Sequence, residues 1–288
     1  ANFSKLGASV VIGEEITYLH SGLFCDDNLL ESITINCDLE FLGVGTFYNT
    51  PELNSVALNG SIEYIFGFTD VFNDDFYTWL TPLEKEQIMY YGAFESCGAE
   101  NYVLPDGVKY IGPAVFGGFC EPESLSLPST LEKIADDFIG SGKTPVITMR
   151  DGGSNAYFDV GQALIAKGAA ADGGDRLIKF ARVGEEKYAV PASVSEVVPF
   201  AFAFANVKWV DFSSSNVTEL PAGCFRGSYV EKITLSSKIT RLLSDGLPEF
   251  DGIPVWARGE IWSASPAVYA CEKLTVLENY QGLTEVGD

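Results

Sequence analysis

The sequence has one histidine, and any catalytic triad or cysteine–histidine pair would have to use it. It is His20, and the nearest cysteine, Cys25, follows five residues later. Nothing else marks the two as a base and its nucleophile, so we expect His20 to lie on a solvated turn. A zinc site would need further histidines or a close cysteine pair, and the sequence offers neither. We therefore predict no catalytic residue, no metal ligand and no cofactor.

Carboxylates are the second group that could do chemistry, because the chain holds 40 acidic residues against 18 basic ones. A glycosidase needs two carboxyl groups held across a cleft, but this abundance makes neighbouring acids common without a catalytic reason. The net charge of −22 argues against a nucleic-acid partner, which requires a basic surface. No apolar run approaches the roughly 20 residues of a membrane span, so no membrane insertion is expected. The acidic pairs, which we interpret as solvated turns, are Asp26–Asp27, Asp74–Asp75, Asp136–Asp137 and Glu185–Glu186.

The segments that position these side chains follow a repeat of about 23 residues. Each unit begins with an apolar residue and has a second one three positions later, and five units have a phenylalanine eight positions after the start. Such a fixed period indicates a solenoid, because one unit cannot bury its own apolar side chains and stacked units can. The starting residues are Ile16, Leu39, Ile62, Val108, Leu131, Val194, Val217 and Ile239, and the phenylalanines are Phe24, Phe47, Phe116, Phe202 and Phe225.

Each unit closes on a short run in which apolar residues alternate with small polar ones, as in LESITI, LNSVAL, SLSL, WVDF and EKITL. This alternation is the pattern of a half-buried strand. Strands stacked in one direction would form a parallel sheet. The phenylalanines would then enter the core from the opposite wall of the solenoid.

A resemblance to a known family is carried by three units, LPDGVKYIGPAVFGGFCEPESLSLPSTLEKI, YAVPASVSEVVPFAFAFANVKWVDF and LPAGCFRGSYVEKITL. They resemble the BspA-like leucine-rich repeats of bacterial surface proteins, over roughly residues 10–149 and 188–248. The resemblance implies a leucine-rich-repeat solenoid of α/β-type repeats, with a stacked parallel β-sheet, short helical insertions and a C-terminal cap. It also implies an extracellular or cell-surface binding protein without a shared catalytic centre. We expect a single elongated domain over residues 1–288, and a monomer; no leader is visible in the chain.

Three stretches depart from the repeat, and two of them are irregular insertions near residues 66–87 and 150–187. In the first, TPLEKEQIMYY predicts a helix start with Thr81 as its N-cap. In the second, DVGQALIAKGAAADGG predicts a short helix, and LIKFARVGEEKYAV predicts a hairpin that turns at Gly184–Glu186. The third, residues 249–288, carries two tryptophans before a last strand, KLTVL, and is interpreted as the C-terminal cap.

The strand residues that point away from the predicted core form a sheet face of small side chains. This face could bind a protein or a glycan, or could do no more than keep the sheet soluble. One place on this face carries larger and charged side chains, because Trp209 and Asp211 align with Lys232 and Thr234 one repeat later. We predict that these four residues form one exposed patch that binds a partner. The small face consists of Ser32, Thr34, Ser55, Ala57, Ser124 and Ser126.

Three functions remain open at this point. The first is a non-enzymatic surface or secreted binding or adhesion module, which the repeat and the missing catalytic residues favour. The second is a glycan-active enzyme built from the irregular insertions. The third is a passive structural spacer that holds another domain away from a surface.

The six cysteines do not indicate a disulfide scaffold, which belongs to small chains with thin cores. Cys25 and Cys224 flank predicted core phenylalanines and are expected to be small core residues. Cys97 and Cys120 lie 23 residues apart, so we expect them at neighbouring places on adjacent coils. Whether the two are bonded stays open.

Overall fold

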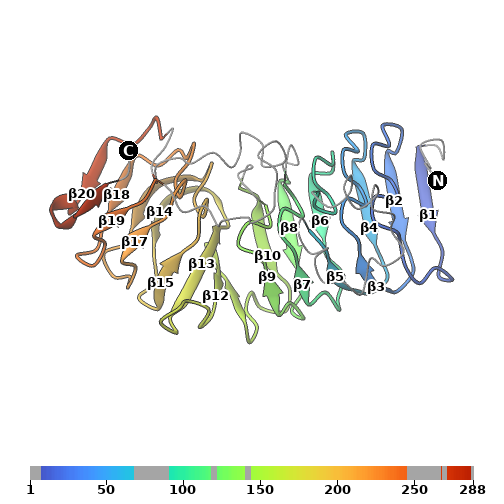
Figure 1. Ribbon diagram of the computed structural model, residues 1–288, viewed down its shortest axis with the longest axis horizontal. Helices are drawn as coiled ribbons and strands as arrows, with labels where there is room; N and C mark the ends of the chain where they lie inside the picture. Colours follow the sequence, from blue (N-terminus) through green and yellow to red (C-terminus); the bar gives the residue numbers. More distant parts are fainter. Residues whose placement is uncertain are drawn as a thin grey trace. The chain divides into compact units, whose positions relative to one another are not determined.

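The computed structural model describes residues 8–67, 91–117, 122–139, 144–244, 267 and 271–286. The chain divides into two compact units (Figure 1). Unit 1 contains residues 1–142 and 148–155, and unit 2 contains residues 143–147 and 156–288. That the chain acts as a single domain stays a prediction.

Unit 1 is the predicted solenoid, and each coil supplies strands to two parallel ladders. The strands pair in the register that the 23-residue spacing predicts, since Ser9 pairs with Ser32 and Ser32 pairs with Ser55. The first ladder contains the sheets β1-β2-β4 and β6-β8-β10, and the second is the sheet β3-β5-β7-β9. Their bounds are β1 Ser9–Ile12, β2 Ser32–Ile35, β3 Leu39–Leu42, β4 Ser55–Leu58, β5 Ile62–Ile65, β6 Asn101–Val103, β7 Tyr110–Ile111, β8 Ser124–Leu127, β9 Lys133–Ile134 and β10 Val146–Met149.

The first break in the repeat does not interrupt the second ladder. Strand β5 pairs directly with β7, so that Tyr64 lies opposite Tyr110 although 46 residues separate them. The chain from Tyr64 to its partner Tyr110 is therefore as long as two repeats. The helix predicted to begin at Thr81 lies outside the described residues.

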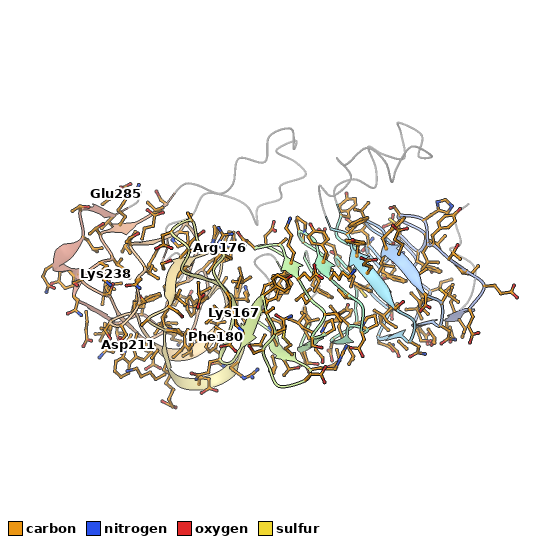
Figure 2. All side chains as sticks on the ribbon, turned by 90° about the horizontal axis from the view of Figure 1, so that it is seen from below. Lys167, Arg176, Phe180, Asp211, Lys238 and Glu285 are labelled. Atoms are coloured by element: carbon orange, nitrogen blue, oxygen red, sulfur yellow. The ribbon has the colours of Figure 1, made fainter. Side chains whose placement is uncertain are left out.

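A column of stacked phenylalanine rings fills the core opposite the sheets, as the spacing predicts. The ring centroids of Phe47 lie 5.4 Å from Phe24 and 5.3 Å from Phe94, with nearly parallel planes. In unit 2, Phe202 stacks on Phe180 at 6.0 Å and on Phe225 at 4.9 Å. Phe180 is labelled in Figure 2. All six rings are buried, and Phe94 and Phe180 join the column although the spacing did not predict them. Parallel offset rings add to the burial of their area, so this column ties each coil to the next.

Unit 2 contains two further parallel ladders and one sheet with antiparallel strands. The parallel sheets are β14-β16-β18-β20 and β17-β19-β21, and the mixed sheet is β11-β12-β13-β15. The bounds are β11 Phe158–Val160, β12 Ala163–Ala166, β13 Asp175–Phe180, β14 Val183–Ala189, β15 Val194–Val197, β16 Asn206–Asp211, β17 Glu219–Leu220, β18 Lys232–Thr234, β19 Arg241–Leu242, β20 Val276–Glu278 and β21 Glu285–Val286.

The two predictions for residues 150–187 are wrong. The predicted helix is the antiparallel pair of β11 and β12. All four residues of β12 are buried, and a short apolar run of this kind does not distinguish a strand from a buried helix. The predicted hairpin is two strands of different sheets, because β13 pairs with β15 while β14 pairs with β16. The glycine at the predicted turn, Gly184, has a φ of 75° and lies at a register shift at the start of β14.

The predicted helical content is also wrong for the described part of the chain, where a 3-10 turn at Tyr280–Gly282 is the one helical segment. Strands thus replace the helices expected of an α/β-type repeat. Of the predicted cap, residues 271–286 are described, and they continue both ladders of unit 2: β20 pairs with β18, and β21 pairs with β19. That the segment closes the end of the stack stays a prediction.

Candidate functional site

The outer face of the first ladder in unit 1 is small and polar, as its sequence indicates. In β2 and β8 the core-facing residues are buried and the alternate ones are half-buried. Hydroxyl groups of neighbouring coils bond along the face, as where Ser32 Oγ donates to Ser9 Oγ at 2.8 Å. The face therefore offers hydroxyl groups and methyl groups, and its exposed hydrophobic side chains include Val11 and Val103.

The corresponding face of unit 2 carries a tryptophan between two lysines. In the strand register, Trp209 of β16 lies opposite Lys187 of β14 on one side and Lys232 of β18 on the other. The Nζ atom of Lys187 lies 3.7 Å from the centroid of the Trp209 ring, and that of Lys232 lies 4.2 Å from it. An ammonium group near an aromatic face is attracted by the ring quadrupole, so the two lysines hold the indole from both sides.

A second row of polar residues lies two positions further along the strands and binds the residues of the first row. Lys187 Nζ lies 2.7 Å from Asp211 Oδ2, and Lys232 Nζ lies 2.8 Å from Glu278 Oε1. The indole N–H of Trp209 donates to Thr234 Oγ1 at 3.0 Å, and this hydroxyl donates to Glu278 Oε2 at 2.8 Å. The resulting Trp209 network crosses all four strands of the sheet and consists of Lys187, Trp209, Asp211, Lys232, Thr234 and Glu278.

Both carboxylates of the Trp209 network are ionised at neutral pH. Partial burial acts to raise the pKa of Asp211, but its bonds to Lys187 and Ser213 outweigh this and lower it. The Lys232 ammonium, with the Thr234 hydroxyl, holds the pKa of Glu278 below its usual value. The Trp209 network therefore carries two positive and two negative charges, each paired.

The structure brings the four predicted residues together, but not all of them are exposed. Thr234 is only 7 % exposed, and the Asp211 side chain is only 12 % exposed. The prediction of an exposed patch is wrong for Thr234, because its hydroxyl lies between the indole N–H and the Glu278 carboxylate. Trp209 and Lys232 are half-buried on the outer face.

Two members of the Trp209 network were missed by the sequence reasoning. A spacing of 23 residues back from Trp209 gives Glu186, but the register shift in β14 places Lys187 there. Glu278 follows Thr234 by 44 residues, because the chain between β18 and β20 is longer than one repeat. The acidic residue at the end of the strand VLE was the one feature of the sequence that could have indicated Glu278.

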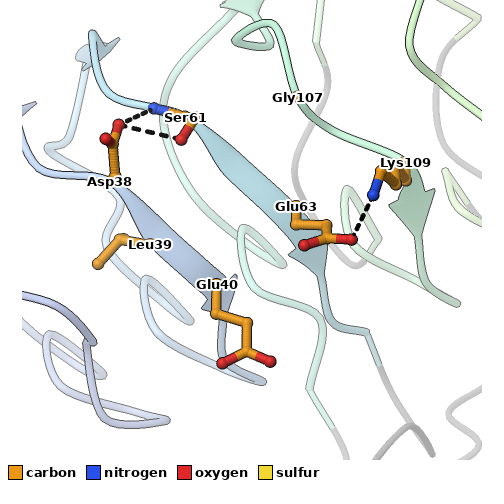
Figure 3. Close-up of a pocket in the computed structure, with 7 residues that line it drawn as sticks. All are labelled: Asp38, Leu39, Glu40, Ser61, Glu63, Gly107 and Lys109. Carbon is orange, nitrogen blue, oxygen red and sulfur yellow. Dashed lines mark hydrogen bonds and ion pairs between the residues drawn. The ribbon is translucent and has the colours of Figure 1, made fainter.

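A groove of about 370 Å³ lies on the outer face of the second ladder of unit 1 (Figure 3). Asp38 accepts hydrogen bonds from the backbone N–H of Ser61 at 2.8 Å and from its hydroxyl at 3.0 Å, and these bonds lower the pKa of Asp38. Lys109 Nζ lies 2.6 Å from Glu63 Oε1. The sequence analysis did not identify this groove. It is lined by Asp38, Leu39, Glu40, Ser61, Glu63, Gly107 and Lys109.

The residues considered for catalysis, His20 and Cys25, both lie between β1 and β2. His20 is exposed, and its ring lies edge-on to Tyr18 at 5.0 Å. Burial, together with the neighbouring Asp26 carboxylate, raises the pKa of the Cys25 thiol to about 12, so it is protonated and a poor nucleophile. In the described ranges, no three histidine, cysteine or acidic side chains are arranged to hold a metal ion. No helix in the described part of the chain is long and apolar enough to cross a membrane.

The cysteine predictions are partly tested. Cys224 is fully buried, as expected of a core residue, whereas Cys25 is only half-buried. The predicted proximity of Cys97 and Cys120 is not tested, because Cys120 lies outside the described residues.

Comparison with known proteins agrees with the repeat. The family model described as the BspA type leucine rich repeat region matches six copies, over residues 3–75, 85–152 and 179–246. Among curated protein sequences, none matches the chain.

Four solved structures are similar to the chain at low sequence identity, among them the following three. A leucine-rich repeat protein from Bacteroides ovatus is 15 % identical, with a TM-score of 0.50, over 97 % of this chain and 71 % of that one. The pneumococcal vaccine antigen PcpA is 14 % identical, with a TM-score of 0.49, over 83 % and 74 % of the two chains. A leucine rich cell surface protein from Faecalibacterium prausnitzii is 15 % identical, with a TM-score of 0.39, over 94 % and 87 %.

Proposed function

Since the chain belongs to the BspA-type leucine-rich repeat family, we propose that it is a non-enzymatic binding or adhesion module. It would act outside the cell or at the cell surface, as the resemblance of its repeats to those of bacterial surface proteins implies. The partner would bind the outer face of the sheet β14-β16-β18-β20. The observation that carries this proposal is the half-buried Trp209 on that face, with a lysine on each side of its ring.

A tryptophan held in this way suits a binding surface. Interface residues that contribute most to affinity are enriched in tryptophan, tyrosine and arginine and are ordered before binding. The Trp209 network orders the indole through two cation–π contacts and one hydrogen bond. Its four charged groups are paired within the chain, so a partner would not have to satisfy an isolated charge.

The same geometry favours a protein partner over a glycan. Sugar-binding sites commonly stack a ring on an open aromatic face, and both faces of Trp209 are covered by ammonium groups. A sugar ring would first have to displace Lys187 or Lys232 from the indole and weaken an ion pair. A protein can instead contact the indole edge and the methylene groups of the lysines.

The test is an array of extracellular proteins and of glycans, probed with the labelled wild type and two variants. We expect protein partners to bind the wild type, and Trp209→Ala to weaken that binding at least tenfold. Tyr229→Ala is the matched control, because Tyr229 is an exposed aromatic residue of unit 2 outside the strands of this sheet. If all three proteins bind equally well, the Trp209 network is not part of the interface.

Two other outcomes separate the remaining functions. If no protein and no glycan on the array binds the chain, a passive structural spacer remains as the proposed function. Hydrolysis of an arrayed glycan would favour the glycan-active enzyme. The binding module predicts neither result.

A further inference from the structure

The outer face of the second ladder carries a row of charged residues at or beside the start of each strand. In unit 1 the row runs through Glu40 of β3, Glu63 of β5 and Lys109, next to β7. In unit 2 the row lies one position later in the repeat and contains Glu219 of β17, Arg241 of β19 and Glu285 of β21. The strands of each ladder are parallel and about 4.8 Å apart, so side chains of this row lie beside those of the adjacent coil.

Opposite charges alternate along most of this row. Arg241 lies between two carboxylates, 2.8 Å from Glu219 and 2.6 Å from Glu285. In unit 1, Lys109 binds Glu63 at 2.6 Å. Cross-strand pairs of opposite charge stabilise a sheet, whereas like charges on adjacent strands destabilise it.

Glu40 and Glu63 break this alternation. The register of β3 and β5 pairs Leu39 with Ile62 and Phe41 with Tyr64, which places the two glutamates side by side. Lys109 reaches Glu63 from the side away from Glu40 (Figure 3). In the described part of the chain, the Glu40 carboxylate forms no hydrogen bond or ion pair. The groove of about 370 Å³ lies over this pair of like charges.

The chain itself shows which side chain suits this face. One coil further on, a lysine pairs with Glu63, and two coils further on Lys133 lies with its Nζ 5.4 Å from the ring centroid of Tyr110. A cation placed between Glu40 and Glu63 would meet two carboxylates.

We propose that this groove receives a lysine or arginine side chain of a polypeptide partner, with its cationic group between the carboxylates of Glu40 and Glu63. Each carboxylate accepts several hydrogen bonds, so Glu63 can bind the incoming cation and keep Lys109. The net charge of −22 attracts a basic partner from a distance. This docking site lies in unit 1 and does not depend on the Trp209 network of unit 2.

The probe is the peptide acetyl-Gly-Arg-Gly-amide, titrated against the whole chain at physiological salt and followed by NMR shifts of the residues around the groove. We expect Glu40→Gln to weaken binding about two- to fivefold, the range of a partly exposed ion pair. Lys109→Met should strengthen it by a similar factor, because the change removes a positive charge that repels the incoming cation. The control Glu100→Gln removes the same charge from an exposed position of unit 1 outside the groove and should leave the affinity unchanged.

Three results would overturn the proposal. Equal weakening by Glu40→Gln and Glu100→Gln would mean that the peptide responds to net charge alone. A peptide with citrulline in place of arginine that binds as well would exclude recognition of a cation. Weaker binding by Lys109→Met would mean that Lys109 contacts the probe itself. Trp209→Ala should not change this titration, which separates a failure here from a failure of the proposed function.

Discussion

The outer face of the first ladder in unit 1 and that of the sheet β14-β16-β18-β20 in unit 2 share one construction and differ in what they display. In both, parallel strands stand in register at one repeat, as Ser32 with Ser55 and Trp209 with Lys232. Unit 1 places hydroxyl and methyl groups on its face, while unit 2 places the Trp209 network there. The core fixes the coil spacing without using the outward positions, so those positions are free to differ. A repeat solenoid therefore fixes where a binding site can lie, but not which residues form it.

The largest effect tests whether the two units share one kind of core. Phe94→Ala in unit 1 and Phe202→Ala in unit 2 each remove one buried ring from the phenylalanine column. We expect each change to lower the free energy of unfolding by about 3–5 kcal/mol, through lost burial and the cavity left behind. Denaturant unfolding measures both. A loss below about 1 kcal/mol in one unit would mean that its coils are held together differently.

The second prediction concerns a charge that sets the core of unit 2 apart. Lys179 is 3 % exposed, its Nζ donates to the carbonyl of Phe200 at 3.0 Å, and no carboxylate among the described residues pairs with it. Burial lowers its pKa to about 7. Replacing a poorly compensated buried charge by an apolar side chain of similar length is commonly stabilising, so Lys179→Met should stabilise the chain by about 1–4 kcal/mol at neutral pH.

The pH dependence of this effect has a defined sign. The unfolded lysine has a pKa near 10.4 and the folded one about 7, so between these values only the unfolded chain binds the proton. The stability of the wild type therefore rises with pH in this window, and the advantage of Lys179→Met shrinks. Below pH 7 both states of the wild type are protonated, and the advantage stays constant. Unfolding curves at pH 6, 7.5 and 9 measure it, and an advantage that grows with pH would contradict the assignment.

The third prediction concerns the face of unit 2 itself. Trp209→Ala removes two cation–π contacts and one hydrogen bond from a half-buried position. Each cation–π contact contributes about 0.5–1 kcal/mol, so we expect a loss of about 1–2 kcal/mol in unfolding free energy. Calorimetric melting checks this. A loss as large as that of Phe202→Ala would show that the indole is a core residue and not a surface one.

The smallest effect is expected on the face of unit 1. Ser32→Ala removes one hydroxyl bond between neighbouring coils at a half-buried position, and should change the unfolding free energy by less than about 0.5 kcal/mol. The same calorimetric measurement applies. A loss equal to that of Trp209→Ala would mean that the hydroxyl rows hold the coils together, and the contrast between the two faces would disappear.

The sequence by itself determined the repeat, the strand register and the phenylalanine column. Each of these follows from identical spacing in successive coils, and identical spacing places equivalent residues on top of one another whatever lies far away in the chain. For this reason the alignment of Trp209 with Lys232 and of Asp211 with Thr234 could be read from a period of 23 residues.

Only the tertiary structure decided what departs from that period. The register shift at the start of β14 places Lys187 beside Trp209, and the long connection after β18 brings in Glu278, which covers Thr234. The pairing of β5 with β7 places Lys109 beside Glu63 at the edge of the groove. The strands β11 and β12 replaced a predicted helix, because an apolar run such as ALIA has no period of its own. In each case the outcome depended on contacts between residues whose separation is not one repeat, and such contacts leave no mark in the spacing of the sequence.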